Sequence, residues 1–258
     1  MGLGDQLMAS GMAKGAKAKG KRVAFGDGKK IIWDHHSEQV FRKNPNIANP
    51  GDERDGDLAW IPFYRGNRIY NTQAGDRWRW NYNFKAEPGE IYLNSGEAAF
   101  GSTYGRGFVV IEPNVPQFKT VAPNKQWPVY RYNAVCEELR RQGYRVVQLN
   151  GGGKHFCPGV ERLPSPNYRL AISVLRHAKL YIGPEGGLHH AAACAGISGV
   201  VLFGGFIPPA VTGYPSIHTN LTGGAEACGK LNKCEHCEQA MQAIRIDDVL
   251  IAAMKYLK

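Results

Sequence analysis

The chain has 258 residues, of which 43% are hydrophobic, so it can build a packed core and global disorder is excluded. This length suits one large domain or two of ordinary size. No apolar run approaches the length of a membrane span, and the N-terminus lacks the apolar block of an export signal, so we expect a cytoplasmic protein.

The net charge of +10 is concentrated early in the chain, in the lysine-rich run of residues 14–22. Such charge favours a polyanionic partner: nucleic acid, an anionic membrane surface or a phosphorylated glycan. Basic residues near a helix C-terminus also suit the helix dipole without any partner. The charge therefore does not distinguish DNA from a lipid-linked sugar.

The first half of the chain is predicted to be irregular. We expect a helix over residues 5–19 and short strands at 22–26 and 31–33. Residues 37–105 are rich in Gly, Asn, Arg and aromatic residues, which indicates short strands and long loops. Within them, residues 77–82 mix Arg, Trp and Tyr, a combination that stacks on bases or sugars but more often fills a small core.

The second half alternates apolar strand-like runs with helical patterns. Strands are expected at 108–113, 144–149, 179–182 and 199–204, and helices at 129–142, 167–178, after residue 187 and within 243–257. A loop is expected between residue 113 and residues 125–128. This alternation predicts an α/β fold with a parallel sheet and helices on both faces. Ligands of such sheets bind beyond the carboxyl ends of the strands, where four residues should converge: Glu112, Asn150, Glu185 and Gly204.

The most informative segment is residues 180–193, where an apolar run meets a Gly-rich turn and then an Ala-rich helix. A helix that starts after such a turn presents backbone N–H groups to an anion, and glycines let the backbone approach the ligand. Glu185 and His189 add a carboxylate and an imidazole beside Gly186 and Gly187. The segment predicts a site for a nucleotide or a nucleotide-sugar diphosphate; a purely structural turn is the alternative.

Three of the six cysteines are closely spaced near the C-terminus: Cys228, Cys234 and Cys237. Without an export signal, disulfides are not the first expectation. A Cys-x2-Cys pair with a third cysteine nearby predicts a structural zinc site, with free thiols or a disulfide as the alternatives. The candidates for the fourth ligand are Cys157, His155 and His236.

Four motifs in a fixed order resemble the heptosyltransferase-type enzymes of glycosyltransferase family 9. They are Leu3-Gly4-Asp5 at a helix start, Lys125-Gln126-Trp127-Pro128 before a helix, the turn from Glu185 into His189 and the following alanines, and Leu202-Phe203-Gly204 followed by Thr212-Gly213. The resemblance covers the second half of the chain well and the first half thinly. Glu185 is offset by one residue from the family's usual acidic position.

The resemblance implies a GT-B fold, with two Rossmann-like domains. Residues 1–105 would form a short acceptor-side domain, and residues 106–258 the domain that binds the nucleotide sugar. The enzyme would transfer a sugar from a nucleotide-diphosphate sugar to a hydroxyl group. The preferred acceptor is a saccharide or a lipid-linked glycan. Two alternatives remain: a transferase that glycosylates modified DNA bases extruded from the duplex, and a catalytically silent nucleotide-binding module.

The resemblance also implies roles for individual residues. Asp5 would be the catalytic base, or else a helix N-cap. Lys125 would neutralise the departing diphosphate, or else be a solvated loop residue. Glu185 would bind ribose hydroxyls, and His189 would bind a phosphate or else only cap the turn. The remaining donor-site residues are Gly4, Asn150, Gly186, Gly187, Thr212 and Gly213.

Overall fold

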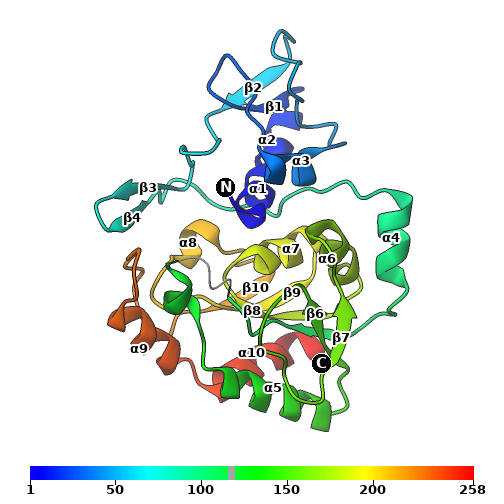
Figure 1. Ribbon diagram of the computed structural model, residues 1–258, viewed down its shortest axis with the longest axis vertical. Coiled ribbons are helices and arrows are strands. Elements are labelled where there is room, and N and C mark those ends of the chain that lie inside the picture. The colour runs from blue at the N-terminus through cyan, green and yellow to red at the C-terminus, as the bar shows by residue number, and fades with distance from the viewer. Residues whose placement is uncertain (116–119) are drawn as a thin grey trace.

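The computed structural model describes residues 1–115 and 120–258 (Figure 1). Its centre is a six-stranded sheet in the order β10-β9-β8-β5-β6-β7, in which all neighbouring strands are parallel. The strands are β5 (Val109–Ile111), β6 (Val146–Asn150), β7 (Glu161–Pro164), β8 (Leu180–Pro184), β9 (Ser198–Leu202) and β10 (His218–Leu221). The sheet confirms the predicted α/β class.

Helices cover both faces of this sheet, as predicted (Figure 1). One face packs on α6 and α7, through side chains such as Val110 and Val201, and the other packs on α5 and α10, through side chains such as Val109 and Val200. Neighbouring residues of one strand point to opposite faces, so these apolar runs are buried on both sides. The helices of this half are α5 (Val129–Arg141), α6 (Tyr168–Leu175), α7 (Gly187–Ala195), α8 (Pro209–Thr212), α9 (Glu235–Ala243) and α10 (Ile246–Leu257), with the 3-10 helix η1 (Ala122–Lys125).

The first hundred residues lie against the α6–α7 face (Figure 1). They contain a two-stranded parallel sheet, β1–β2, and an antiparallel hairpin, β3–β4. Their elements are α1 (Leu3–Ser10), α2 (Met12–Lys17), β1 (Arg22–Phe25), α3 (His35–Phe41), β2 (Leu58–Ile61), β3 (Asn71–Ala74), β4 (Arg77–Trp80) and α4 (Ser95–Ser102).

Several predicted elements have different bounds in the structure. The helix expected over 5–19 is divided into α1 and α2, and residues 31–33 form no strand but only an isolated bridge from Ile31 to Gly26. The Asp27 side chain accepts from the backbone of Lys29 and Lys30, which closes a tight turn in place of a longer pairing. The sequence did not predict β7, β10, α8 or α9. The loop expected after residue 113 includes residues 116–119, which lie outside the described residues.

Within residues 1–115 and 120–258, no helix combines the length and the apolar character that crossing a membrane requires.

Arg169 of α6 is a buried ion-pair partner that joins distant segments. It donates to both carboxylate oxygens of Glu97 in α4, at 2.6 and 2.8 Å, and to the carbonyl oxygens of Gln39 and Tyr92. The Arg169 hydrogen bonds outweigh the effect of burial and lower the pKa of Glu97 to about 2. The first half of the chain is therefore bound to α6 by charge-assisted hydrogen bonds as well as by apolar packing.

Because the folded-state pKa of Glu97 lies below its unfolded value, its contribution to stability is present above pH 4.5 and is lost as the pH falls towards 2. We expect Glu97→Gln to lower the free energy of unfolding by about 3 kcal/mol at pH 6. That difference from wild type should shrink steadily in urea unfolding at lower pH. Glu38→Gln, at an exposed position of α3, is the matched control. A stability difference between Glu97→Gln and wild type that does not depend on pH would contradict a lowered pKa of Glu97.

Candidate active site

The N-termini of α1 and α7 meet at one point. Gly4 approaches the Gly-rich turn so closely that a Cβ atom on it would lie 2.9 Å from the Cα atom of Gly187 and 2.9 Å from Cδ2 of His190. Only glycine fits this contact without a shift of the neighbouring backbone. The contact brings the Leu3-Gly4-Asp5 motif to the turn that follows β8, although the two are far apart in the sequence.

Asp5 uses its two carboxylate oxygens differently. Oδ2 accepts a hydrogen bond from the backbone N–H of Gly2 at 2.9 Å, and Oδ1 accepts one from the Tyr70 hydroxyl at 2.8 Å. The guanidinium of Arg68 lies 3.8 Å from Oδ2. The N-cap of α1 is Gly2 and not Asp5, which is the third residue of the helix and binds back to the N-cap backbone. The second oxygen of Asp5 is held by a side chain 65 residues away.

Lys125 and Glu185 form a buried ion pair at the carboxyl end of the sheet. Lys125 ends η1, and its side chain is only 16% exposed, while that of Glu185 is 4% exposed. Burial by itself would raise the pKa of Glu185, but the charge of Lys125 and the hydrogen bond with His190 hold this pKa well below its ordinary value. The carboxylate is thus ionised and Lys125 is not a solvated loop residue.

The two histidines of the turn have different surroundings. His190 lies with Nε2 3.5 Å from Glu185, and its Nδ1 is 2.8 Å from the Tyr214 hydroxyl. His189 is fully buried, and within the described residues neither of its ring nitrogens has a hydrogen-bond partner. Burial and the neighbouring His190 hold the pKa of His189 well below its ordinary value, so its ring is neutral.

The histidine that faces the acidic residue is therefore His190, whereas the sequence motif pointed to His189. The His189 ring packs instead against Phe203, Tyr214 and His218, with centroids 5.1–5.5 Å apart. Ligand atoms of Glu185, His189 and His190 lie within 4.8 Å of one another, as in a metal site. The Lys125 ammonium on the same carboxylate opposes a metal cation there.

The other predicted donor-site residues are only partly brought together. Gly186 and Gly187 open α7, and the Gly187 carbonyl accepts from the Tyr168 hydroxyl at 2.7 Å. Thr212 and Gly213 end α8, immediately before Tyr214, whose hydroxyl reaches His190. Asn150 is exposed at the end of β6, two strands away from β8.

The residues that sequence reasoning missed are Arg68, Tyr70, His190 and Tyr214. Two of them follow directly on predicted residues, since His190 succeeds His189 and Tyr214 succeeds Gly213. Arg68 and Tyr70 carry no local signal, because they lie in the irregular segment before β3 and reach Asp5 only through the tertiary fold.

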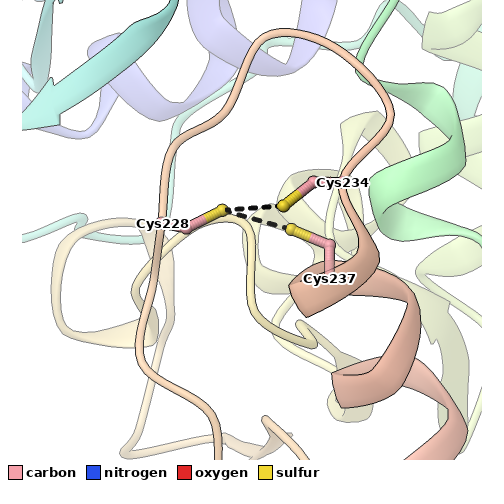
Figure 2. A group of neighbouring side chains, drawn as sticks. All are labelled: Cys228, Cys234 and Cys237. Atoms are coloured by element: carbon pink, nitrogen blue, oxygen red, sulfur yellow. Dashed lines mark hydrogen bonds between the residues drawn. The ribbon is translucent and has the colours of Figure 1, made fainter.

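The three late cysteines are gathered at one point, on the loop before α9 and its first turn (Figure 2). The Sγ atom of Cys228 lies 3.3 Å from that of Cys237 and 3.9 Å from that of Cys234. None of the predicted fourth ligands belongs to this group of described residues. His236 bonds to the carbonyl of Glu226, His155 faces Asn133, and Cys157 lies beside Cys136.

The cysteine loop, residues 228–237, contacts both sides of the site. The β3–β4 hairpin binds it through the backbone N–H of Trp78, which donates to the carbonyl of Gly229 at 2.9 Å. The buried Asn124 side chain, next to Lys125, donates to the carbonyls of Lys230 and Asn232 and accepts from the N–H of Cys234, at 2.8–2.9 Å.

The features described so far are typical of a glycosyltransferase that uses a nucleotide sugar. They are a parallel α/β sheet with a Gly-rich helix start, a buried lysine–glutamate pair and a nearby aspartate. The sequence profile of glycosyltransferase family 9 (heptosyltransferase) matches residues 77–241, and the chain belongs to this family. It is therefore an enzyme, a nucleotide-sugar-dependent glycosyltransferase.

Two solved structures share the whole architecture. One is the glycosyl transferase family 9 protein of Veillonella parvula DSM 2008, with 14% identity and a TM-score of 0.63, covering 100% of this chain and 95% of that one. The other is the iron-containing dodecameric glycosyltransferase TibC of enterotoxigenic E. coli H10407, with 16% identity, a TM-score of 0.64 and 98% and 73% coverage. This likeness confirms the α/β fold of the GT-B type. Within the described residues the first half contains only the two-stranded sheet β1–β2 and the hairpin β3–β4, which is smaller than the Rossmann-like domain expected there. No curated protein matches the chain.

Removal of the Lys125 charge should destabilise the protein, because it leaves the Glu185 carboxylate buried and uncompensated. We expect Lys125→Met to lower the free energy of unfolding in urea by about 3–5 kcal/mol. The double variant with Glu185→Gln should lose less than the single one, since no buried charge remains. Lys17→Met, at an exposed position, is the control. A double variant that is less stable than the single one would contradict this account.

Proposed function

We propose that this enzyme transfers a sugar from a nucleotide-diphosphate sugar to a hydroxyl group of a saccharide or lipid-linked glycan, with Asp5 as the base. The observation that supports it most directly is the contact of Gly4 with Gly187 and His190. Asp5 follows Gly4 directly, so on this proposal the proton acceptor lies close to the anion-binding N–H groups at the start of α7.

The proposed chemistry is a displacement at the anomeric carbon of the donor sugar. Asp5 takes the proton of the acceptor hydroxyl as its oxygen forms the new glycosidic bond. The bond from the anomeric carbon to the diphosphate breaks, and the nucleoside diphosphate departs. Lys125 and the N–H groups at the start of α7 stabilise the charge that develops on the leaving oxygen. The reaction also requires that the two substrates are held in line between Asp5 and the start of α7.

We also propose the division of labour between the two parts of the chain. Residues 1–105 would bind the acceptor and residues 106–258 the donor. Asp5 comes from the first part, while Lys125 and Glu185 come from the second. Gly186, Gly187, Thr212 and Gly213 line the donor side, and Glu185 binds the ribose hydroxyls. On this proposal His190, rather than His189, faces the phosphates.

The test of Asp5 as the base requires that the donor nucleotide sugar is identified first. A thermal-shift screen of nucleoside diphosphates and their sugars selects the donor, because a saturating ligand raises the apparent stability. Asp5→Asn should then lower turnover by about a hundredfold or more and leave the affinity for the donor nearly unchanged. Glu38→Gln serves as the exposed control. Turnover at the wild-type rate in Asp5→Asn would remove Asp5 from the mechanism.

The exposed basic residues favour the alternative in which the acceptor is a modified base in DNA. Lys17, Lys19 and Lys21 are exposed, as are Arg77 and Arg79 on β4. If DNA is the acceptor, replacing the three lysines by Gln should reduce the slope of duplex affinity against salt by about three, because each lysine that neutralises a phosphate contributes about one. No measurable affinity for duplex at low salt would exclude DNA and leave the glycan.

We further propose that Cys228, Cys234 and Cys237 bind a structural metal ion. Zinc–thiolate bonds of about 2.3 Å in a tetrahedron place the sulfur atoms roughly 3.8 Å apart. The observed separations of 3.3 and 3.9 Å suit this arrangement. Three thiolates fit zinc, the expected ion, and TibC's description as iron-containing makes iron the other ion to count.

Protein purified without chelator should contain about one zinc or iron ion per chain by elemental analysis. Cys237→Ser should abolish the metal content and lower the melting temperature, because metal binding to a folded site adds to stability. Cys194→Ser, a cysteine outside the cluster, should keep the metal. Metal-free protein with an unchanged melting temperature would contradict the site.

A further inference from the structure

We infer that Tyr70 is a positioning residue that fixes the orientation of the Asp5 carboxylate. The inference rests on the proposed function, in which Asp5 is the base. Tyr70 reaches Asp5 from outside helix α1, and its hydroxyl donates to Oδ1 at 2.8 Å. No feature of the sequence around residue 70 suggests this contact.

The Tyr70 side chain is held on several sides. It is 4% exposed, and its ring lies 6.2 Å from that of Phe84. Its backbone carbonyl accepts from the N–H of Asn81 at 2.9 Å, and the Asn81 side chain donates to the carbonyl of Ile69. The phenol therefore approaches Asp5 from a fixed direction, and the carboxylate cannot rotate without losing its hydrogen bond.

The phenol also remains a donor throughout the useful pH range. Burial, and then the negative charge of Asp5, raise the pKa of Tyr70 well above 10. Arg68 and Glu185 also act on Tyr70, and Tyr168 interacts electrostatically with Asp5. A hydrogen bond to the ionised carboxylate favours that form, which is the form a base requires.

The hydrogen bonds that Tyr70 and Gly2 donate to Asp5 are compatible with a bound acceptor. A carboxylate offers about four lone-pair positions, so Tyr70 and Gly2 can each hold one oxygen while an acceptor hydroxyl donates to another lone pair. With the plane of the carboxylate fixed, each lone pair points in one direction. The acceptor hydroxyl that binds there is aligned before reaction, which lowers the orientational cost of the proton transfer.

The test compares Tyr70→Phe with wild type by carboxyl-carbon NMR of protein labelled at the aspartate side chains. The Asp5→Asn variant identifies the Asp5 signal. In Tyr70→Phe this signal should titrate about one to two pH units higher, because a hydrogen bond to the charged form is lost. Tyr82→Phe, at a position that is 55% exposed, should leave it unchanged. A purely structural tyrosine would change only the melting temperature.

Turnover gives the second readout, with the nucleotide sugar that shows the largest thermal shift. Tyr70→Phe should lower the rate of nucleoside diphosphate release about tenfold to a hundredfold without changing donor affinity. Replacement of Tyr70 by 4-aminophenylalanine, which keeps a donor at the same place, should restore most of the rate. This rescue keeps the test decisive even if Tyr70→Phe is poorly folded.

An Asp5 signal that titrates identically in Tyr70→Phe and wild type overturns the inference, as does an unchanged rate. The Asp5→Asn variant separates this failure from that of the proposed function. If Asp5→Asn is inactive and Tyr70→Phe is normal, only the role of Tyr70 is wrong. If Asp5→Asn turns over at the wild-type rate, Asp5 is not the base, and the inference fails with it.

Discussion

The site depends on the close approach of two helix N-termini at Gly4 and Gly187. Each N-terminus carries a partial positive charge, so their contact is electrostatically unfavourable unless negative charge lies nearby. Asp5 in the first turn of α1 and Glu185 just before α7 provide that charge. The two acids therefore stabilise the contact between the two parts of the chain.

The buried Lys125–Glu185 pair is suited to a ligand that brings its own negative charge. An ammonium group has three N–H donors, so Lys125 can keep Glu185 and still bind a phosphate oxygen. The glutamate holds the lysine in place before any ligand arrives, so on the proposed mechanism little reorganisation is needed when charge develops on the leaving group. His190 and Tyr214 extend the same network, since His190 contacts both Glu185 and Tyr214.

The central strands of the second half were predictable because each is one continuous apolar run. The predicted convergence of the strand ends was only partial, since Asn150 lies two strands away from Glu185. The sequence did not show which of the two histidines in the turn faces Glu185. That depends on where α7 starts, because one residue along a helix rotates the side chain by about 100°, and α7 starts at Gly187. The position of Asp5 was predicted from the motif, but its partner was not. Tyr70 lies 65 residues away in a loop-rich segment, where no periodicity exists to indicate which side chains are buried.

The cysteine loop connects two segments of the candidate site, the β3–β4 hairpin and η1. Its backbone binds the hairpin that follows Tyr70, and Gly229 lies so close that a Cβ atom there would be 2.3 Å from the Trp78 carbonyl oxygen. Its carbonyls also hold Asn124, and so η1 and Lys125. A metal ion bound to the three thiols would fix this loop and, through it, the segments that carry the proposed base partner and the leaving-group lysine. The metal ion would then affect sugar transfer only by fixing the positions of these segments. A structural metal ion bound by thiolates stabilises a fold in this way and takes no part in the reaction.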